Sequence, residues 1–267
     1  MNIFGKSFTY DGIPSSTYNV MLCAFEPPSP SRETALAQTI LRGETNPYRA
    51  IPNYYASKYT DVLKFDAAIA KCDGTPFLPS ERREIMAWLT GPQAPVPFII
   101  QEDDDGYHQG IEYFAKCVNY AEYWPSDSLC GLIFSFECDG PYGYSPEEMT
   151  DFEAISGTPA IIRINNTSDE RRQDHYPIIE LTAGATGMVT ITNSVYPDEP
   201  LTLSVKNGQQ LTIDNRLGLI EDNLDMFDYA TDTNLKWVRL AYGPNTLTID
   251  GHARGCVKCR YIRKAGI

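Results

Sequence analysis

The chain has 267 residues, which is enough for one large domain or two ordinary ones, each able to bury a core. Hydrophobic residues make up 42% of the chain and charged residues 21%, a composition typical of an ordered globular protein and not of a disordered one. The net charge of −13 argues against nucleic acid and anionic membranes as partners, because binding to phosphate depends on clustered Lys and Arg.

The first residues lack the charged and apolar regions of a secretory signal, and no apolar run approaches the length of about 18 residues that crosses a membrane. We therefore expect no membrane insertion, and synthesis in a cytoplasm. The cysteines are odd in number and lie mostly in apolar runs, which predicts reduced, buried thiols. They are the seven residues at positions 23, 72, 117, 130, 138, 256 and 259.

Short strands are predicted at the beginning of the chain. Asp11-Gly12 suits a tight turn between two of them. A further strand is expected over Tyr18–Phe25, and the prolines that follow cannot donate in a ladder, so the chain leaves the sheet there. The segment Ser31–Leu41 fits either a short helix capped by Ser31 or an extended arm, and periodicity does not decide between the two.

Apolar alternation predicts four more strands before the middle of the chain. In Asp61–Ala70 the residues of one face are all apolar, namely Leu63, Phe65, Ala67 and Ile69. The other three strands are expected over Val96–Gln101, Gly110–Val118 and Gly131–Cys138.

One clear helix follows the Asp61–Ala70 strand. Ser80 can accept hydrogen bonds from the first-turn amides, and Glu81 complements the positive end of the helix. Gly91-Pro92 ends it. We expect the helix to pack Trp88 against the sheet, because one stripe of the helix is apolar. That stripe consists of Ile85, Met86, Trp88 and Leu89.

A domain boundary is predicted where Asp139–Ser145 concentrates turn-forming residues and Ser145–Asp151 is polar. This gives domains over residues 1–143 and 144–267. After the boundary, short strands recur at a spacing of roughly ten residues, the pattern of a β-sandwich. They are expected over Ala160–Ile164, Pro177–Thr182, Gly187–Asn193, Glu199–Val205 and Gln210–Ile213.

The end of the chain carries the most informative pattern. Within Leu235–Gly251, two runs of alternating apolar residues flank the turn Tyr242–Asn245, and a third run covers Cys256–Ile262. The pattern predicts three closing strands of one antiparallel sheet. The loop Glu221–Asp228 interrupts the sandwich before them.

Cys256 and Cys259 have the spacing of half a metal knuckle or of a redox pair. On a strand, however, the two side chains point to opposite faces, so both sulfurs cannot reach one ion without a bend. No second Cys-x-x-Cys motif is present, and no helix starts after the pair as a redox site needs. We therefore assign this pair neither a metal nor a redox role.

Two groups of acidic residues could bind a cation. Glu102–Gly106 lacks the alternating acids and the final Glu of a calcium loop, so a solvated hairpin loop is favoured. Asp222, Asp225 and Asp228 could gather oxygens around a cation, or they could form a charged rim that keeps a sheet edge soluble. We favour the rim.

No catalytic, cofactor-binding or metal-binding residue is predicted, and no cofactor or enzyme activity. His108, His175 and His252 are each expected in a turn without a local partner, and Gly-x-Ser-x-Gly is absent. Gly184 and Gly187 lie between predicted strands, without the helix of a dinucleotide site. The 17 tyrosines and three tryptophans fit sugar stacking, protein interfaces or the cores themselves.

Six segments in order carry a family resemblance. The first half contains the strand Val62–Ile69, the helix Glu81–Leu89, and Phe134–Tyr144 with its Phe-x-Phe-x-Cys-x-x-Pro-Tyr pattern. The second half contains Pro177–Leu181, Met188–Asn193 and Arg239–Ile249. With these segments spread over nearly its full length, the chain resembles the distal tail proteins (Dit-like) of long-tailed bacteriophages and prophages.

The resemblance implies a mainly β fold, in which a β-rich, ring-forming tail hub domain with one short helix precedes a galectin-like antiparallel β-sandwich. It implies a structural virion protein of the tail tip, or baseplate hub. A hexameric ring would join the tail-tube protein to a tail-associated fibre or lysin protein, with the tape-measure protein as a further partner. No large insertion carries an extra carbohydrate-binding module. The alternative is a lectin-like module for host cell-wall saccharides, if the sandwich itself keeps a groove.

Overall fold

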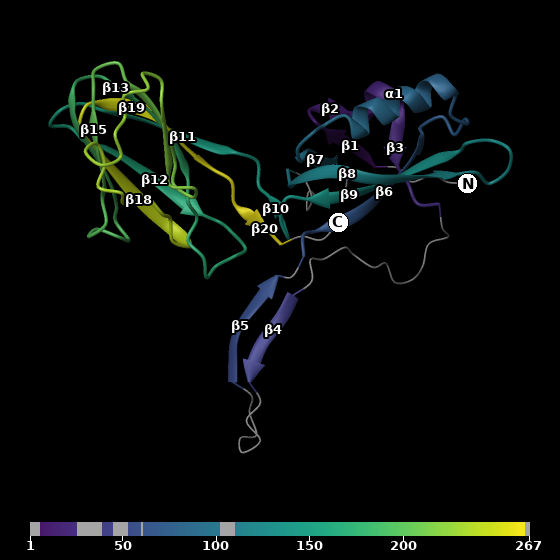
Figure 1. Ribbon diagram of the computed structural model, residues 1–267, viewed down its shortest axis with the longest axis horizontal. Helices are drawn as coiled ribbons and strands as arrows, with labels where there is room; N and C mark the ends of the chain where they lie inside the picture. The colour runs from purple at the N-terminus through teal and green to yellow at the C-terminus, as the bar shows by residue number, and fades with distance from the viewer. Residues whose placement is uncertain (1–5, 26–38, 45–52, 60, 102–109, 265–267) are drawn as a thin grey trace. The chain divides into compact units, whose positions relative to one another are not determined.

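The computed structural model describes residues 6–25, 39–44, 53–59, 61–101 and 110–264 (Figure 1). The chain forms two compact units, one made of residues 1–145 and 263–267 and the other of residues 146–262. Each unit encloses its own cluster of buried apolar side chains. Antiparallel strands dominate both units, which confirms the predicted mainly β fold. No helix in the described ranges is long and apolar enough to cross a membrane.

The first unit is built on a sheet that curls into a small barrel. Its strands follow the order β2-β1-β7-β8-β9-β6-β3. Lys6 and Leu22 exchange two backbone hydrogen bonds, of 3.1 and 2.9 Å, which join the β1 and β3 ends of this path. The strands are β1 (Ser7–Tyr10), β2 (Ile13–Pro14), β3 (Val20–Leu22), β6 (Lys64–Lys71), β7 (Val96–Gln101), β8 (Glu112–Tyr123) and β9 (Gly131–Cys138).

Several short elements complete the first unit. The 3-10 helix η1 (Ser15–Tyr18) precedes β3, and β10 (Gly143–Tyr144) pairs with both β8 and β20 (Ile262–Arg263). β4 (Thr39–Glu44) and β5 (Asn53–Tyr59) pair with each other as a separate two-stranded sheet.

Aromatic side chains fill the core of the barrel. Phe8 stacks on both Trp88 and Phe98, with ring centroids 5.5 and 5.2 Å away. Phe65 stacks on Phe136 at 5.3 Å. Such ring pairs stabilise a fold beyond the area that they bury, so this core is specified by ring geometry as well as by hydrophobicity.

The helix α1 (Pro79–Thr90) lies on the barrel as predicted, with Ile85, Trp88 and Leu89 buried. The indole Nε1 of Trp88 donates to the carbonyl of Tyr10 at 3.1 Å, which anchors the helix to the sheet. The predicted cap is wrong. Leu78 holds the N-cap position and Ser80 lies inside the first turn, because Pro79 occupies the first helical position that proline favours. The Glu81 carboxylate accepts from the Leu78 amide at 2.8 Å instead.

The other predictions for the first half are mostly confirmed. β6, β7 and β9 are present, and Asp11 and Gly12 have the positive φ values, 52° and 72°, of a tight turn. β8 continues five residues past its predicted end at Val118, to Tyr123. The strand expected over Tyr18–Phe25 is shorter, because η1 takes Tyr18 and β3 ends at Leu22.

Two predictions fall mainly outside the described residues. Of Ser31–Leu41 only Thr39–Leu41 is described, and it begins β4. Glu102–Gly106 is not described at all.

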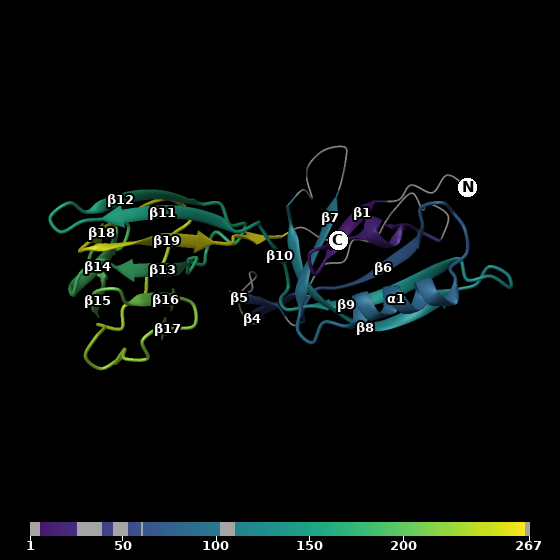
Figure 2. The ribbon, with the colours of Figure 1, turned by 90° about the horizontal axis from the view of Figure 1, so that it is seen from above.

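The second unit is a β-sandwich. One sheet has the order β11-β19-β13-β16-β17 and the other β12-β18-β14-β15 (Figure 2). Buried side chains of both sheets form one core. The first sheet consists of β11 (Glu148–Ala154), β13 (Ile178–Ala183), β16 (Gln210–Asp214), β17 (Leu219–Asp222) and β19 (Ala253–Cys259). The second consists of β12 (Ala160–Asn166), β14 (Gly187–Asn193), β15 (Leu201–Val205) and β18 (Gly243–Asp250).

The prediction of three closing strands at the end of the chain is wrong in part. β18 and β19 exist, but they belong to different sheets, so they do not form one hairpin ladder. The predicted turn Tyr242–Asn245 lies largely within β18. The polar segment Ser145–Asp151, expected as a linker, leads into β11, whose pairing with β19 begins at Glu148.

The first of the three runs, Leu235–Ala241, forms no strand and makes a single bridge, between Leu240 and His175. Four buried asparagines, at positions 166, 193, 215 and 245, bond to its backbone instead. The bonds are Asn166 Nδ2 to Leu240 O (3.0 Å), Asn193 Nδ2 to Arg239 O (2.7 Å), Val238 N to Asn215 Oδ1 (2.8 Å) and Ala241 N to Asn245 Oδ1 (3.0 Å). The segment is therefore fixed without a ladder, because side-chain amides satisfy its buried backbone groups.

Candidate functional site

Cys256 and Cys259 lie on opposite faces of β19, as the sequence predicted. Cys259 is buried in the sandwich core, whereas Cys256 is on the solvent side, where its Sγ donates to Glu180 Oε2 at 3.7 Å. Burial raises the pKa of both thiols, that of Cys259 to about 11. Because the thiolate is the reactive and metal-binding form, this pair is poorly suited to redox or metal chemistry.

The seven cysteines form no disulfide. Of these thiols, only Cys138 and Cys259 are fully buried, and Cys72 is exposed. The prediction of buried thiols is therefore right for two positions only.

The described histidines do not form a site. His252 lies in the turn between β18 and β19 as predicted, while His108 is outside the described residues. The prediction for His175 is wrong, because its backbone bridges Leu240 and its ring lies 5.1 Å from that of Tyr261. Burial, with Arg216 nearby, lowers the pKa of His175 to about 4.

The acids at the end of β17 and in the loop after it have a local structural role. Asp222 accepts from the amides of Leu224 and Met226 at 3.0 and 2.9 Å, and Asp228 Oδ1 accepts from Ala230 at 2.9 Å. Within the described ranges, no group of three or more His, Cys, Asp or Glu residues could hold a metal ion. These carboxylates therefore shape the loop that carries them.

That loop, residues 223–234, closes one side of the sandwich, and we call it the strap. The Tyr229 hydroxyl accepts from the amide of Ile220 in β17 at 2.6 Å and donates to its carbonyl at 3.0 Å. On the other sheet, Ser204 N in β15 donates to Asp232 O at 2.8 Å, and Thr202 N donates to Asn234 Oδ1 at 3.1 Å. The strap thus satisfies backbone groups of β15 and β17, the strands at one end of each sheet, where another chain could otherwise pair.

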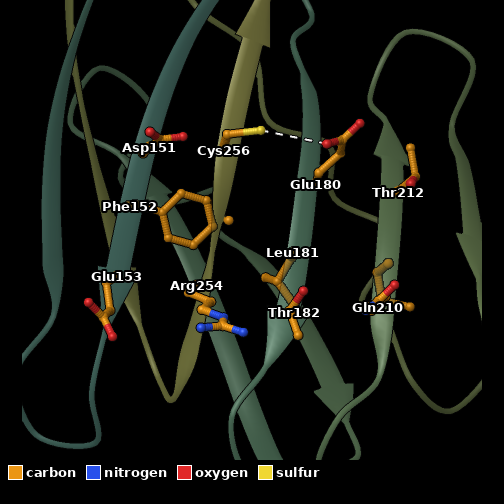
Figure 3. A pocket seen from close by; sticks show the side chains of 12 residues that line it. Asp151, Phe152, Glu153, Glu180, Leu181, Thr182, Gln210, Thr212, Arg254 and Cys256 are labelled. Carbon is orange, nitrogen blue, oxygen red and sulfur yellow. Dashed lines mark hydrogen bonds between the residues drawn. The ribbon is translucent and has the colours of Figure 1, made fainter.

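A hollow lies on the solvent face of the five-stranded sheet (Figure 3). Asp151, Cys256 and Glu180 stand in register across β11, β19 and β13. Lys258 donates to Glu180, and this bond lowers the pKa of Glu180. The rest of the lining is mostly polar, with Glu153, Thr182, Gln210, Thr212 and Arg254.

Gly255 allows the close strand packing beneath this hollow. A Cβ at this position would lie 1.9 Å from the carbonyl oxygen of Glu180. The one aromatic residue in the lining, Phe152, is buried. The hollow therefore offers hydrogen-bonding groups but no exposed ring.

The first unit has an open strand edge. β7 pairs with β8 only from Glu112 to Ala115, whereas β9 follows β8 to Tyr123. On the side away from β9, no described strand pairs with Cys117–Tyr123, which we call the β8 edge. Val118 and Tyr120 on this edge are 54% and 39% exposed, and Trp124 just beyond it is 51% exposed. Sequence analysis missed this edge, because it depends on where β7 begins to pair.

Two protein families together match almost the whole chain. The phage tail protein N-terminal domain matches residues 4–140, and the phage tail C-terminal domain matches residues 142–259. No curated protein matches the chain.

Solved structures share the fold over nearly the full length. The crystal structure of the SPP1 Dit protein, described as a paradigm of the hub adsorption apparatus in phages infecting Gram-positive bacteria, matches with a TM-score of 0.64 and 13% identity. That match covers 96% of this chain and 99% of the other. The phage P2 baseplate in its activated conformation, with Ca or with Sr, gives in each case a TM-score of 0.55 at 8% identity, covering 98% of both chains.

Proposed function

Since the chain belongs to a family of phage tail proteins, we propose that it is a structural virion protein of the tail tip, the baseplate hub. The family match over both halves of the chain is the observation that carries this proposal. The fold shared with the SPP1 Dit hub protein supports it. The protein is made in the host cytoplasm, acts in the virion and catalyses no reaction.

In this proposal the first unit forms a closed homo-oligomeric ring, most simply a hexamer. The ring joins the tail-tube protein to the tail-associated fibre or lysin protein, and the tape-measure protein is a further neighbour. The open β8 edge supports ring formation, because a repeated head-to-tail contact covers such an edge in every subunit once the ring closes.

We also propose that residues 1–143 and 144–267 are separable domains, the second of them galectin-like. The support is that each half has its own core. Limited proteolysis should cut within Asp139–Ser145 before it degrades either half. Cleavage at scattered positions, with no stable half surviving, would reject the boundary.

Saccharide binding by the sandwich is the second candidate, and the polar hollow on the five-stranded sheet favours it. Arg254, Glu153 and Gln210 could donate to and accept from sugar hydroxyls. Sugar sites commonly add an aromatic ring for stacking, and none is exposed in the hollow. We therefore rank the structural hub above the lectin-like module.

One set of assays separates the hub, the lectin and an enzyme. The full-length protein is used as bait for tail-tube and tail-fibre proteins, and it is also applied to a glycan array and to a cell-wall hydrolysis assay. The hub predicts capture of tail proteins, no glycan signal and no hydrolysis. Glycan binding that disappears in Arg254→Ala and Glu153→Ala, but persists in the control Arg163→Ala on the other sheet, would establish the lectin instead. Measurable hydrolysis would overturn both.

A further inference from the structure

We propose that β17 and the strap form a docking surface for a basic, apolar segment of a neighbouring tail protein. This contact rests on the proposed tail-hub function and goes beyond it, because it names the surface and the chemistry of its partner. The contact joins side chains, so the strand edges beneath the strap stay covered.

Exposed apolar side chains gather around the strap. Five large ones are each between 43% and 60% exposed, namely Leu217, Leu219, Leu224, Met226 and Leu235, and we call them the strap patch. The segments that carry them contact one another. Asp222 accepts from the amides of Leu224 and Met226, and a Cβ at Gly218 would lie 3.3 Å from the ring of Trp237. Apolar side chains gathered in this way on a protein surface mark an interaction site.

A strained backbone presents Leu235. Its φ is 56°, in the left-handed region that is an outlier for a bulky residue. Asn234 holds the chain on both sides of it, because its Oδ1 accepts from the amides of Thr202 and Lys236 at 3.1 and 3.2 Å. The Asn234 Nδ2 also donates to the carbonyl of Pro200 at 2.7 Å. Strain that the surroundings maintain is found at functional sites, and here it keeps an apolar side chain 55% exposed.

The charge around the strap patch is negative throughout. Residues 221–235 contain no Lys, Arg or His and five acids, namely Glu221, Asp222, Asp225, Asp228 and Asp232. Asp222, Asp228 and Asp232 accept from backbone amides of the loop. Glu221 and Asp225 are exposed, and their carboxylates form no hydrogen bond or ion pair within the described part of the chain. Acids alone would keep a sheet edge soluble, but the apolar side chains between them oppose solubility, so the combination favours a partner.

A segment with Lys or Arg beside apolar side chains fits this surface. Its cations would pair with Glu221 and Asp225, and its apolar groups would cover the strap patch. A second copy of the chain fits poorly, because each copy has a net charge of −13 and like charges oppose contact. Nucleic acid and phosphate-bearing glycans are repelled for the same reason.

The test measures binding of three purified probes to the immobilised full-length protein. The probes are the tail-tube protein, the tape-measure protein and the tail-associated fibre or lysin protein of the same phage. The apolar variant carries Leu224→Ser and Met226→Ser. Its matched control carries Ile161→Ser and Met188→Ser, at positions on the other sheet of the sandwich that are 65% and 64% exposed. Circular dichroism and the Tm of every variant verify folding.

A second pair of variants tests the charges. The charge variant carries Glu221→Gln and Asp225→Asn, and asparagine tolerates the left-handed φ of 50° at position 225. The matched control carries Glu84→Gln and Asp198→Asn, which are exposed acids elsewhere in the chain. Binding is measured at low and at high salt, because salt screens exposed charges.

We expect one probe to bind wild type and both controls equally, and to bind the apolar variant about tenfold more weakly, a loss of about 1.4 kcal/mol. The charge variant should bind more weakly at low salt, with a difference from wild type that shrinks at high salt. A probe that binds wild type and all variants equally would overturn the strap contact and leave the hub function standing. Binding of no probe to wild type would overturn both.

Leu235→Gly separates binding from folding. Glycine adopts a left-handed φ without strain, so the variant should keep or raise the Tm of wild type and yet bind the probe more weakly. A lower Tm with unchanged binding would show that Leu235 serves the fold alone, and would overturn its part in the contact. Light scattering of each protein without a probe tests the other occupant. A mass that changes in the apolar or charge variant but not in its control would assign the strap patch to a contact between copies instead.

Discussion

The two units differ in how they treat the edges of their sheets. In the sandwich, the strap covers β15 and β17, using the Tyr229 hydroxyl and the backbone of Asp232. In the barrel, the β8 edge pairs with β9 but has no described strand on its other side, and β4 and β5 pair only with each other among the described strands. Because uncovered edges are places where chains can join, we expect an assembly contact at the β8 edge and none at β15 or β17.

The two cores differ as well. Rings of Phe, Tyr and Trp fill much of the barrel, whereas the sandwich core is mainly Ile, Leu and Val, with Phe152 and Tyr261 as its buried aromatics. Large rings fill the interior of the barrel, whereas the two sheets of the sandwich are joined by aliphatic side chains that interdigitate. We therefore expect that removing one large buried ring lowers the free energy of unfolding of the barrel more than removing one side chain lowers that of the sandwich.

The largest effect is expected for Trp88→Ala. The indole contacts Phe8, Tyr10 and Tyr18 and donates to the Tyr10 carbonyl, so its loss should cost about 3–5 kcal/mol, the usual scale for emptying a core aromatic site. Trp124→Ala is the control, at a position that is 51% exposed, and should cost less than about 1 kcal/mol. Urea unfolding measures both. If both variants lost the same free energy of unfolding, the aromatic core would not depend on the contacts that Trp88 makes.

Acid should weaken the sandwich through His175. Its folded-state pKa of about 4 lies below the value of about 6.5 in the unfolded chain, so between these values only the unfolded state binds the proton. Stability should therefore fall as the pH falls through this window, by up to about 3 kcal/mol at about 1.4 kcal/mol per pH unit.

His175→Gln isolates this contribution. The free energy of unfolding of wild type minus that of the variant should decrease between about pH 7 and pH 4. A difference that stays constant would mean that the imidazole protonates as readily in the folded protein as in the unfolded one.

A smaller effect is expected for Tyr229→Phe, which removes the hydroxyl that bonds both the amide and the carbonyl of Ile220. The free energy of unfolding should fall by about 1–2 kcal/mol, because the backbone groups of Ile220 lose their partner. The variant should also self-associate more readily, because the β17 edge is then uncovered. Tyr242→Phe is the control, at a position that is 46% exposed, and should change little. Unfolding and sedimentation measure the two effects. If neither the free energy of unfolding nor the degree of self-association changed, the rest of the strap would be sufficient to cover the β17 edge.

Local pattern predicted much of the strand content. β7, β9 and β14 have their predicted bounds, because each alternates between a buried and a solvated face. β11 was missed, because three of the four residues in Glu148–Asp151 are polar and its first buried apolar position is Phe152. Leu235–Ala241 alternates like a strand but is held by buried asparagines from distant positions, and no local pattern contains that information.

The candidate assembly site was less predictable. The β8 strand itself was recognised, but the open edge depends on the register between β7 and β8. The assignment of β18 and β19 to different sheets is likewise a property of long-range pairing. The strap was recognised only as an interruption, because the bond from Tyr229 to Ile220 cannot be inferred from a run of acids.

Hydrogen exchange of the full-length protein tests most directly whether the first unit carries the assembly contacts. Amide exchange is compared between concentrated protein and protein diluted until it dissociates. We predict that assembly slows exchange in β4, β5 and Cys117–Tyr123, and leaves β15 and β17 unchanged. Protection that instead appears on the sandwich strands, with the β8 edge exchanging equally in both samples, would contradict this account.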